Sequence, residues 1–391
     1  MNSHQISDHL HVVTMQQPCC AEHFLAAPTV RDVDMKTLMA DIETYLRQND
    51  AKIASQEVFC SKGDEASLTR RFEEKLGPLN WPLTCTDWQR EGLIGIQLWA
   101  VSKVKIDPIT MNGYTIGSVF EDDCARYCRL GGLRSTDISK DRDTQAYELF
   151  QLIEKTLVEA GFSLKDILRT WFYMDDILTW YGDFNKVRND FFLKKGIFKG
   201  LVPASTGIGS GNASGSAVVG GLIAVRPKCG DVQARTVDSP LQCSAGDYGS
   251  SFSRAVELAL PCYRRLFVSG IASIAPEGHT IHVGDVDAQI VKTMDVVDAI
   301  LCSRKMDWRN VVHGIVYIRN PQDMVRYEQY CRDYCLPPMP VVISNSTVCR
   351  DDLLFEIEVD ALSANPMITE SDTPLSSCAR KTECSDKSTR D

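Results

Sequence analysis

The sequence predicts an α+β protein in which one unit of strands and helices occurs three times. Two segments share the element order β-β-α-β-α-β-β, and a segment at the start of the chain follows a shortened version of it. In each segment a proline-containing break follows the second helix, and an apolar strand closes the unit. Only the third closing strand carries acidic side chains within its apolar run, at Glu356 and Glu358. We therefore expect three similar units, of which only the third contributes acidic side chains to an active site.

The third unit is expected at residues 261–363. Apolar residues at helical spacing, from Ile290 to Leu301, predict its first helix. Pro321 lies near the first turn of the second helix, and the proline-rich run 337–340 ends it. The expected strands of this unit are 265–270, 280–283, 311–317, 341–344 and 353–362.

The second unit is expected at 111–226, and the first, at 31–110, is expected to be truncated because it lacks an opening hairpin. The elements predicted for the second unit are a strand and glycine turn at 124–132, a helix at 146–160, a strand at 167–173, a helix at 181–192 and a closing strand at 216–225. Helices and strands alternate in any α+β protein, and for the first unit alone this simpler explanation stays open.

Three stretches are expected to lie outside the units. Residues 1–30 are predicted to form a flexible N-terminus. Residues 227–260 are rich in Gly, Ser and Asp, and a connection this long indicates a functional cover over a site. Residues 364–391 have almost no large apolar side chains, which predicts a disordered tail.

Composition and charge narrow the possible functions. A net charge of −10 disfavours nucleic acid as a partner, because phosphate contacts need a basic face, but a small anionic substrate needs only two or three local cations. No apolar run approaches the roughly 18 residues of a membrane span, and the first residues do not resemble a signal peptide. We expect a cytoplasmic protein without a membrane partner.

The 15 cysteines are odd in number and scattered, which does not indicate a disulfide framework. Together with the seven histidines they form no pattern with metal-ligand spacing, so neither a metal nor an organic cofactor is expected. Most of these thiols are expected to be small buried side chains in a reducing compartment.

The third unit resembles the RidA/YjgF (endoribonuclease L-PSP-like) family. The runs that carry the resemblance are 266–270, 287–289, 311–317 and 355–361. The family forms homotrimers of a chorismate-mutase-like α+β fold with ligand clefts between subunits. Three RidA/YjgF-like units in one chain therefore imply an intramolecular pseudo-trimer, either as a monomer or within a higher homo-oligomer.

Three longer runs, 169–185, 202–209 and 346–356, resemble the chorismatases, which carry RidA-like domains and release pyruvate from chorismate. This likeness spans roughly residues 90–363. It implies a cofactor-independent enzyme that cleaves the enolpyruvyl ether of chorismate. The products implied are pyruvate and either 3-hydroxybenzoate or a dihydroxycyclohexadiene carboxylate.

The chain departs from the parent RidA family at the position of its substrate-binding arginine. Met339 stands there in the third unit and Ser205 in the second. Glu356 falls on the family's glutamate of the closing strand, whereas Gly95 and Val219 stand at the corresponding positions of the other units. The resemblance thus implies that one of the three clefts has a catalytic acid, and it argues against deaminase chemistry.

Cleavage of an enol ether requires a proton on its terminal carbon, which leaves an oxocarbenium ion for water or a neighbouring hydroxyl to capture. A buried carboxylic acid with a raised pKa is a suitable donor. Glu356 lies between apolar neighbours on the strand, and strand alternation places Glu358 on the same face. We favour Glu356 as the catalytic acid; the alternative is that both acids only bond the backbone.

Further candidates lie around this acid. Cys349 resembles the cysteine of the chorismatase subtype that makes 3-hydroxybenzoate; a plain buried thiol is the open alternative. The residues expected to bind the substrate are Tyr181 and Arg188 on one helical face, the donor-rich run Ser205, Thr206 and Gly207, and Arg254 in the long connection. For Arg188 a solvated surface position is an equally open alternative.

Two other functions remain in competition with a chorismatase. One is a RidA-type enamine/imine deaminase, which Met339 disfavours. The other is a non-catalytic protein that binds a small metabolite in the same cleft. The product released, the oligomeric state and the pathway served are not fixed by the sequence.

Overall fold

The computed structural model describes residues 2–7, 9–27, 35–61, 63–76, 84–86 and 93–365. These residues form an α+β structure with three sheets, each accompanied by two helices. The predicted α+β class with three sheets is therefore confirmed.

The first sheet has the strand order β1-β2-β3-β6-β4-β5, followed by the short strand β12 from later in the chain. Its strands are β1 (Asn2–Ser7), β2 (Leu10–Gln16), β3 (Ala21–Ala27), β4 (Ala51–Ser61), β5 (Thr84–Thr86), β6 (Leu93–Ser102) and β12 (Gly211–Asn212). The helices of this part of the chain are α1 (Met35–Gln48) and α2 (Glu65–Leu76).

The second sheet has the order β7-β8-β9-β13-β10-β11. Its strands are β7 (Ile106–Met111), β8 (Tyr114–Glu121), β9 (Ala125–Leu133), β10 (Ile167–Met174), β11 (Ala204–Gly209) and β13 (Val218–Pro227). The helices are α3 (Arg142–Glu159), capped by the Asp141 side chain, and α4 (Tyr181–Lys195), which ends at Gly196 in the left-handed conformation.

The third sheet has the order β14-β15-β16-β19-β17-β18. Its strands are β14 (Gln233–Val237), β15 (Ala255–Ala259), β16 (Tyr263–Ala272), β17 (Val311–Ile318), β18 (Val341–Asn345) and β19 (Phe355–Ala364). The helices are α5 (Val286–Ser303), capped by Asp285, and α6 (Met324–Asp333).

All three sheets share one topology. In each, the third strand of the segment pairs antiparallel with the last, and the last pairs antiparallel with the fourth. The fourth strand in turn pairs in parallel with the fifth. Parallel neighbours need a crossover, and the second helix of each segment supplies it. The closing strands β6, β13 and β19 therefore occupy equivalent central positions in their sheets.

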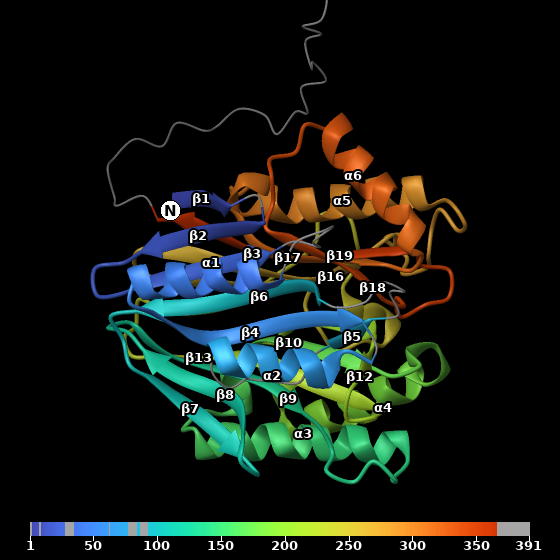
Figure 1. Cartoon of the computed structure of the whole chain (residues 1–391). Coiled ribbons are helices and arrows are strands. Elements are labelled where there is room, and N and C mark those ends of the chain that lie inside the picture. The colour runs from blue at the N-terminus through green and yellow to red at the C-terminus, as the bar shows by residue number, and fades with distance from the viewer. Residues whose placement is uncertain are drawn as a thin grey trace, which may run out of the picture.

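Each sheet buries one face against its own helices and the other against the remaining sheets. Separate apolar clusters fill the spaces between α1 and α2 and the first sheet, between α3 and α4 and the second, and between α5 and α6 and the third. A fourth cluster joins residues from all three sheets. The helices consequently lie on the outside, with α5 and α6 at the top of the view and α3 along the bottom (Figure 1).

The expectation of a flexible N-terminus at 1–30 is wrong for the described residues of that range, because they form β1, β2 and β3. The first segment therefore has its opening hairpin, and the prediction of a truncated unit is wrong as well. His23 of β3 is buried, with Nδ1 2.9 Å from the Tyr45 hydroxyl and Nε2 3.2 Å from the Ser102 hydroxyl. Two bonded ring nitrogens allow a histidine to lie inside a core.

The predicted connecting loop at 227–260 contains β14 and β15, so it completes the third sheet as well as joining two segments. Four of the five β14 residues are exposed, as expected for an edge strand. The sequence of β14 therefore lacks the alternation of apolar and polar residues by which a strand is predicted. Conversely, the strand expected at 280–283 is absent from the described residues there, where only an isolated bridge joins Ile274 and Thr280. Each segment thus has three strands before its first helix. The predicted tail 364–391 lies outside the described residues after Asn365.

Among the described residues, no helix combines the length and apolar character required to cross a membrane.

The burial of β3 gives a direct test of the N-terminal strands. Phe24 is fully buried, stacks on Trp99 and meets the His313 ring edge-on. We expect Phe24→Ala to lower the free energy of unfolding by about 3–5 kcal/mol, measured by urea denaturation. The matched control is Ile6→Ala in β1, where the side chain is 44% exposed and the loss should be well below that value. Equal small effects for both variants would contradict the burial of β3.

Candidate active site

A cavity of about 210 Å³ lies where the edge strand β11 of the second sheet meets β16 of the third. Seven of the eight site residues predicted from the sequence line it. These are Tyr181, Arg188, Ser205, Gly207, Arg254, Cys349 and Glu356. They come from α4, β11, the long connection, the turn after β18, and β19, so the structure brings together residues far apart in the chain.

Glu356 stands at the beginning of β19, where its backbone is in register with Ala272 of β16 and Tyr317 of β17. The side chain is 4% exposed, and within the described part of the chain nothing donates a hydrogen bond to its carboxyl group. Gly270 provides the space for this group, because a Cβ at that position would overlap a carboxyl oxygen of Glu356. The fold thus accommodates a buried carboxyl group that receives no hydrogen bond from the described residues.

Burial, together with the nearby charge of Glu358, raises the pKa of Glu356 to about 8, although Arg169 and Arg254 act in the opposite direction. A carboxyl group with this pKa is mostly protonated at neutral pH. It is therefore a proton donor in the resting state.

Glu358, two residues along the same strand, is bonded very differently. One carboxylate oxygen accepts a hydrogen bond from Arg169 Nη2 at 2.8 Å, and the other accepts from the Trp171 indole at 2.7 Å. Both oxygens therefore have partners from the second sheet. This arrangement supports the preference for Glu356 as the reactive acid and makes Glu358 a link between sheets.

Thr206 is the one predicted site residue that does not line the cavity. Successive side chains of a strand point to opposite faces, so Ser205 and Gly207 face the cavity and Thr206 faces away. Its hydroxyl oxygen accepts hydrogen bonds from Arg169 Nη2 at 2.6 Å and from the Gly270 backbone at 3.0 Å. Thr206 therefore holds Gly270, and with it the space around Glu356, in place.

Two buried arginines lie near an aromatic ring in the lining of the cavity. The guanidinium carbons of Arg188 and Arg254 lie 5.9 and 5.7 Å from the centroid of Phe252. Asn185 accepts a hydrogen bond from Arg188 at 2.6 Å, and the Cys243 carbonyl accepts one from Arg254 at 3.0 Å, which fixes both side chains. The surface alternative for Arg188 is wrong, since it is 2% exposed.

Sequence reasoning missed several lining residues, chiefly Asn185, Phe252, Gly270 and Arg350. Asn185 lies four residues after Tyr181, on the same helical face as Tyr181 and Arg188. The helical spacing that predicted those two residues could therefore have predicted Asn185 as well. Arg350 follows Cys349 directly and donates to the Gly278 carbonyl at 2.9 Å. With Arg350 the lining holds three arginines and one acid, so the cavity suits an anionic ligand.

Cys349 lies beside Glu356. Burial raises the pKa of its thiol to about 12, with a further contribution from the Glu356 charge. The thiol is therefore neutral at physiological pH, and neither a nucleophilic thiolate nor a general base is available there.

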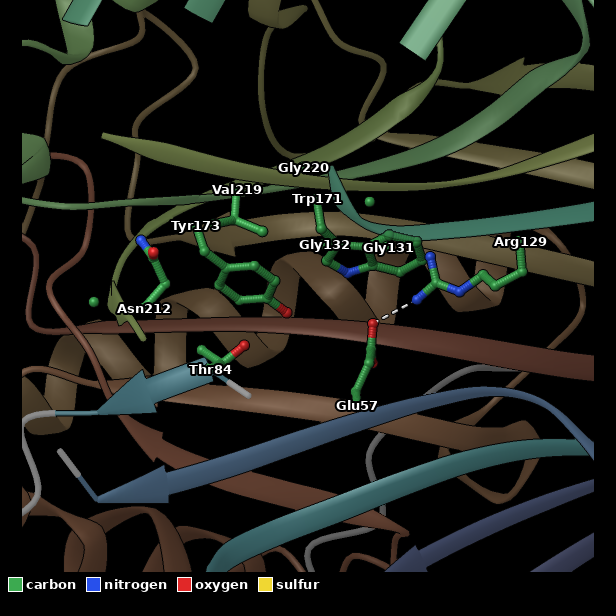
Figure 2. A pocket seen from close by; sticks show the side chains of 12 residues that line it. Glu57, Thr84, Arg129, Gly131, Gly132, Trp171, Tyr173, Asn212, Val219 and Gly220 are labelled. Atoms are coloured by element: carbon green, nitrogen blue, oxygen red, sulfur yellow. Dashed lines mark hydrogen bonds and ion pairs between the residues drawn. The ribbon is translucent and has the colours of Figure 1, made fainter. Parts of the chain in front are cut away.

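The equivalent positions at the other two sheet contacts lack such an acid. Between the first and second sheets, Val219 replaces Glu356 beside Gly131, Gly132 and Gly220, and the inner space there is only about 20 Å³ (Figure 2). Glu57 lies at its inner end in a 2.6 Å ion pair with Arg129. On β6, Gly95 occupies the position and is closely covered by Val342 of β18. Among the described residues, no group of three His, Cys, Asp or Glu side chains could hold a metal ion.

Residues 249–363 match the family model described as Endoribonuclease L-PSP. The chain is 28% identical over 281 residues to a 3-hydroxybenzoate synthase of Streptomyces hygroscopicus, covering 64% of this chain and 78% of that protein. It is 29% identical over 253 residues to a chorismatase of the same organism, covering 59% and 70%. The predicted resemblance to the chorismatases is confirmed.

The fold agrees with this resemblance. A crystal structure of a chorismatase superposes with a TM-score of 0.61 over 88% of this chain and 98% of that chain, at 20% sequence identity. The likeness to this chorismatase therefore extends well beyond the segment that matches the family model.

The protonation state of Glu356 can be tested through stability. Below about pH 8 the folded chain retains a proton on Glu356, whereas the ordinary pKa of a glutamate is 4.5, so the unfolded chain releases it. The free energy of unfolding therefore falls as the pH rises from about 4.5 to about 8, because the unfolded chain gives up this proton and the folded chain does not. Glu356→Gln removes that loss, and relative to the wild type it should gain on the order of a few kcal/mol across this range.

The measurement is urea denaturation of both proteins at pH 5, 7 and 9. Glu277→Gln, an exposed site, serves as the control and should show a constant difference from the wild type. A constant difference for Glu356→Gln as well would show that Glu356 titrates normally.

Proposed function

We propose that this chain is a chorismatase, which cleaves the enolpyruvyl ether of chorismate to pyruvate and 3-hydroxybenzoate. The observation that carries the proposal is Glu356, a buried acid without a hydrogen-bond partner among the described residues, in a cavity walled by arginines. Named relatives of this chain, a 3-hydroxybenzoate synthase and a chorismatase, support the same activity.

In the proposed reaction Glu356 transfers its proton to the terminal methylene carbon of the enol ether. The positive charge that develops on the ether carbon is stabilised by the carboxylate left behind. The neutral state of the acid before this step follows from the raised pKa of Glu356, about 8.

The two carboxylates of chorismate suit a cavity whose described lining holds three arginines. Arg188 and Arg254 both lie within 6 Å of the Phe252 ring centroid, so each is close enough to bind one carboxylate while the substrate ring packs near Phe252. Ser205, Gly207 and Tyr181 complete the wall on the side of the second sheet. This arrangement favours a dianion with an unsaturated ring over a simple monocarboxylate.

The choice of product depends on how the cation is quenched. Formation of 3-hydroxybenzoate and pyruvate is an isomeric cleavage with no net consumption of water, whereas the dihydroxycyclohexadiene carboxylate requires one added water. Cys349 is neutral and lines the same cavity as Glu356. Its proposed role is to exclude water and orient the intermediate, which favours the aromatic product.

We further propose that the three segments act as RidA-like units of an intramolecular pseudo-trimer, which makes a monomer sufficient for activity. The shared strand order of the three sheets and the apolar cluster that joins them support this arrangement. Buried free thiols such as Cys20 and Cys128 suit a reducing, cytoplasmic location.

The competing functions receive less support. In the deaminase alternative an arginine would stand at Met339 or Ser205, but Met339 packs against the core of the third sheet and Ser205 accepts a hydrogen bond from Thr170. A metabolite-binding protein without activity shares the same cavity. Only turnover separates it from an enzyme.

We expect the purified protein to release pyruvate from chorismate, and Glu356→Gln to lower kcat at least about 1,000-fold because the proton donor is lost. Pyruvate is followed with coupled lactate dehydrogenase, and the ring product by chromatography beside 3-hydroxybenzoate. Binding of chorismate to Glu356→Gln is measured in parallel and should persist. Glu277→Gln should retain full activity.

Turnover that survives in Glu356→Gln would exclude Glu356 as the acid. Binding of chorismate without any pyruvate from the folded wild type would favour the metabolite-binding protein.

The pH dependence provides an independent check. Because Glu356 must be protonated to donate, kcat/KM should be level below about pH 8 and fall about tenfold per pH unit above it. Initial rates with chorismate between pH 6 and 10 measure this profile. Activity that rises with pH through this range would indicate a required carboxylate and contradict the proposed order of proton transfers.

A further inference from the structure

A second cleft lies between the first and second sheets, at the position equivalent to the candidate active site. There β5 of the first sheet contacts the second segment through β12, in which Gly211 pairs with Cys85 and Asn212 with Thr84. At the candidate active site the same role falls to the bridge between Gly209 of β11 and Thr347. The two sheet contacts are thus built alike.

The second cleft opens into a larger cavity than the candidate active site. Gly132 borders both the narrow inner space seen in Figure 2 and an outer cavity of about 600 Å³, compared with about 210 Å³ around Glu356. Pockets for small molecules commonly measure about 300–1,000 Å³. The outer cavity is therefore large enough for a small organic ligand.

The walls of this cavity correspond to those of the candidate active site, with different side chains. Helix α2 contributes Thr69 and Glu73 where α4 contributes its tyrosine and arginine. Arg134 follows Gly132 by two residues, as Ala272 follows Gly270. Val219 replaces the catalytic acid, so the second cleft is equipped for binding and lacks the proton donor.

The charges of the cavity indicate which ligand it suits. Arg134 is half-buried and donates to the Gly132 carbonyl at 3.0 Å, and among the described residues no carboxylate forms an ion pair with it. It is the one cation of the described lining, and Glu73 on another wall disfavours a second negative charge. A single carboxylate fits this arrangement, whereas the three arginines of the candidate active site suit a dianion.

The remaining lining of the cavity combines apolar and aromatic side chains with small polar ones such as Thr115 and Ser135. Ile116 is buried and Met111 is half-buried, while Tyr114 at the tip of the β7–β8 hairpin is 72% exposed and offers a ring face at the rim. Aromatic rings stack favourably on such faces. We propose that the second cleft is a separate, non-catalytic binding site for aromatic monocarboxylic acids, with Arg134 binding the carboxylate.

The product proposed above, 3-hydroxybenzoate, belongs to this class of ligand, and that extension alone rests on the proposed function. A product site outside the catalytic cavity would allow the product concentration to act on the enzyme without competing for Glu356. The binding site itself needs no turnover to be detected.

The test uses the full chain and benzoate as the probe, with dissociation constants measured by isothermal titration calorimetry. Arg134→Gln should weaken benzoate binding at least about tenfold because the charge that holds the carboxylate is lost. Ala213→Trp places a large ring at an exposed position of the cavity wall and should block binding without removing a buried contact. Circular dichroism confirms that each variant is folded.

Arg188→Gln is the matched control, because it removes a cation from the other cavity and should change benzoate affinity less than about twofold. Benzyl alcohol, which has the ring without the charge, should bind at least about tenfold more weakly than benzoate. The proposal is overturned if Arg188→Gln weakens benzoate while Arg134→Gln does not, if the two ligands bind equally, or if no binding is seen at 10 mM. Absence of pyruvate formation would refute the proposed activity and leave this result unaffected.

Discussion

The contact between the second and third sheets is the constraint on which the candidate site depends. Arg169 of β10 bonds both Thr206 and Glu358, and Thr206 in turn accepts a hydrogen bond from the Gly270 backbone. These bonds connect β10, β11, β16 and β19 across the sheet boundary in a buried region. The space left beside Gly270 is occupied by the Glu356 carboxyl. The position of the acid is therefore determined by an interface whose polar groups face away from the cavity.

The treatment of buried acids elsewhere shows why Glu356 stands out. Glu358 has two donors, Glu57 is paired with Arg129, and Glu22 accepts hydrogen bonds from Trp99 and Tyr263. A buried carboxylate without such partners is costly, so an acid without them is kept neutral instead. Among these four glutamates only Glu356 lacks a protein hydrogen bond within the described structure, and it lines the cavity between the second and third sheets. Hydrogen bonding, more than burial, separates the proposed catalytic acid from the other three glutamates.

Site residues that lie on regular helices and strands could be predicted from the sequence more readily than those in irregular connections. Acids within an apolar strand indicated Glu356 and Glu358, and the resemblance to the RidA family favoured Glu356. Helical spacing placed Tyr181 and Arg188 on one face. Thr206 was placed wrongly because the sequence names a donor-rich run without fixing which alternate residues of the strand face inward. Phe252 lies in an irregular connection, where no periodicity exists to interpret. The strands β1 to β3 were missed because a buried histidine such as His23 gives no sign in the sequence of its partners Tyr45 and Ser102.

The protonation states of the cavity also limit how the proposed reaction can end. Formation of an aromatic product requires loss of a proton from the ring, and a base must accept it. Cys349 does not serve, since burial holds the pKa of its thiol near 12. The carboxylate that Glu356 becomes after the first transfer is the remaining acceptor among the described lining residues, because the other charged groups there are arginines. One proton leaves Glu356 and one returns, so the acid is restored without net uptake of water. In the proposed reaction one glutamate is thus sufficient for both proton transfers. This is consistent with a scaffold that has three similar sheet contacts and an acid of this kind at only one of those described.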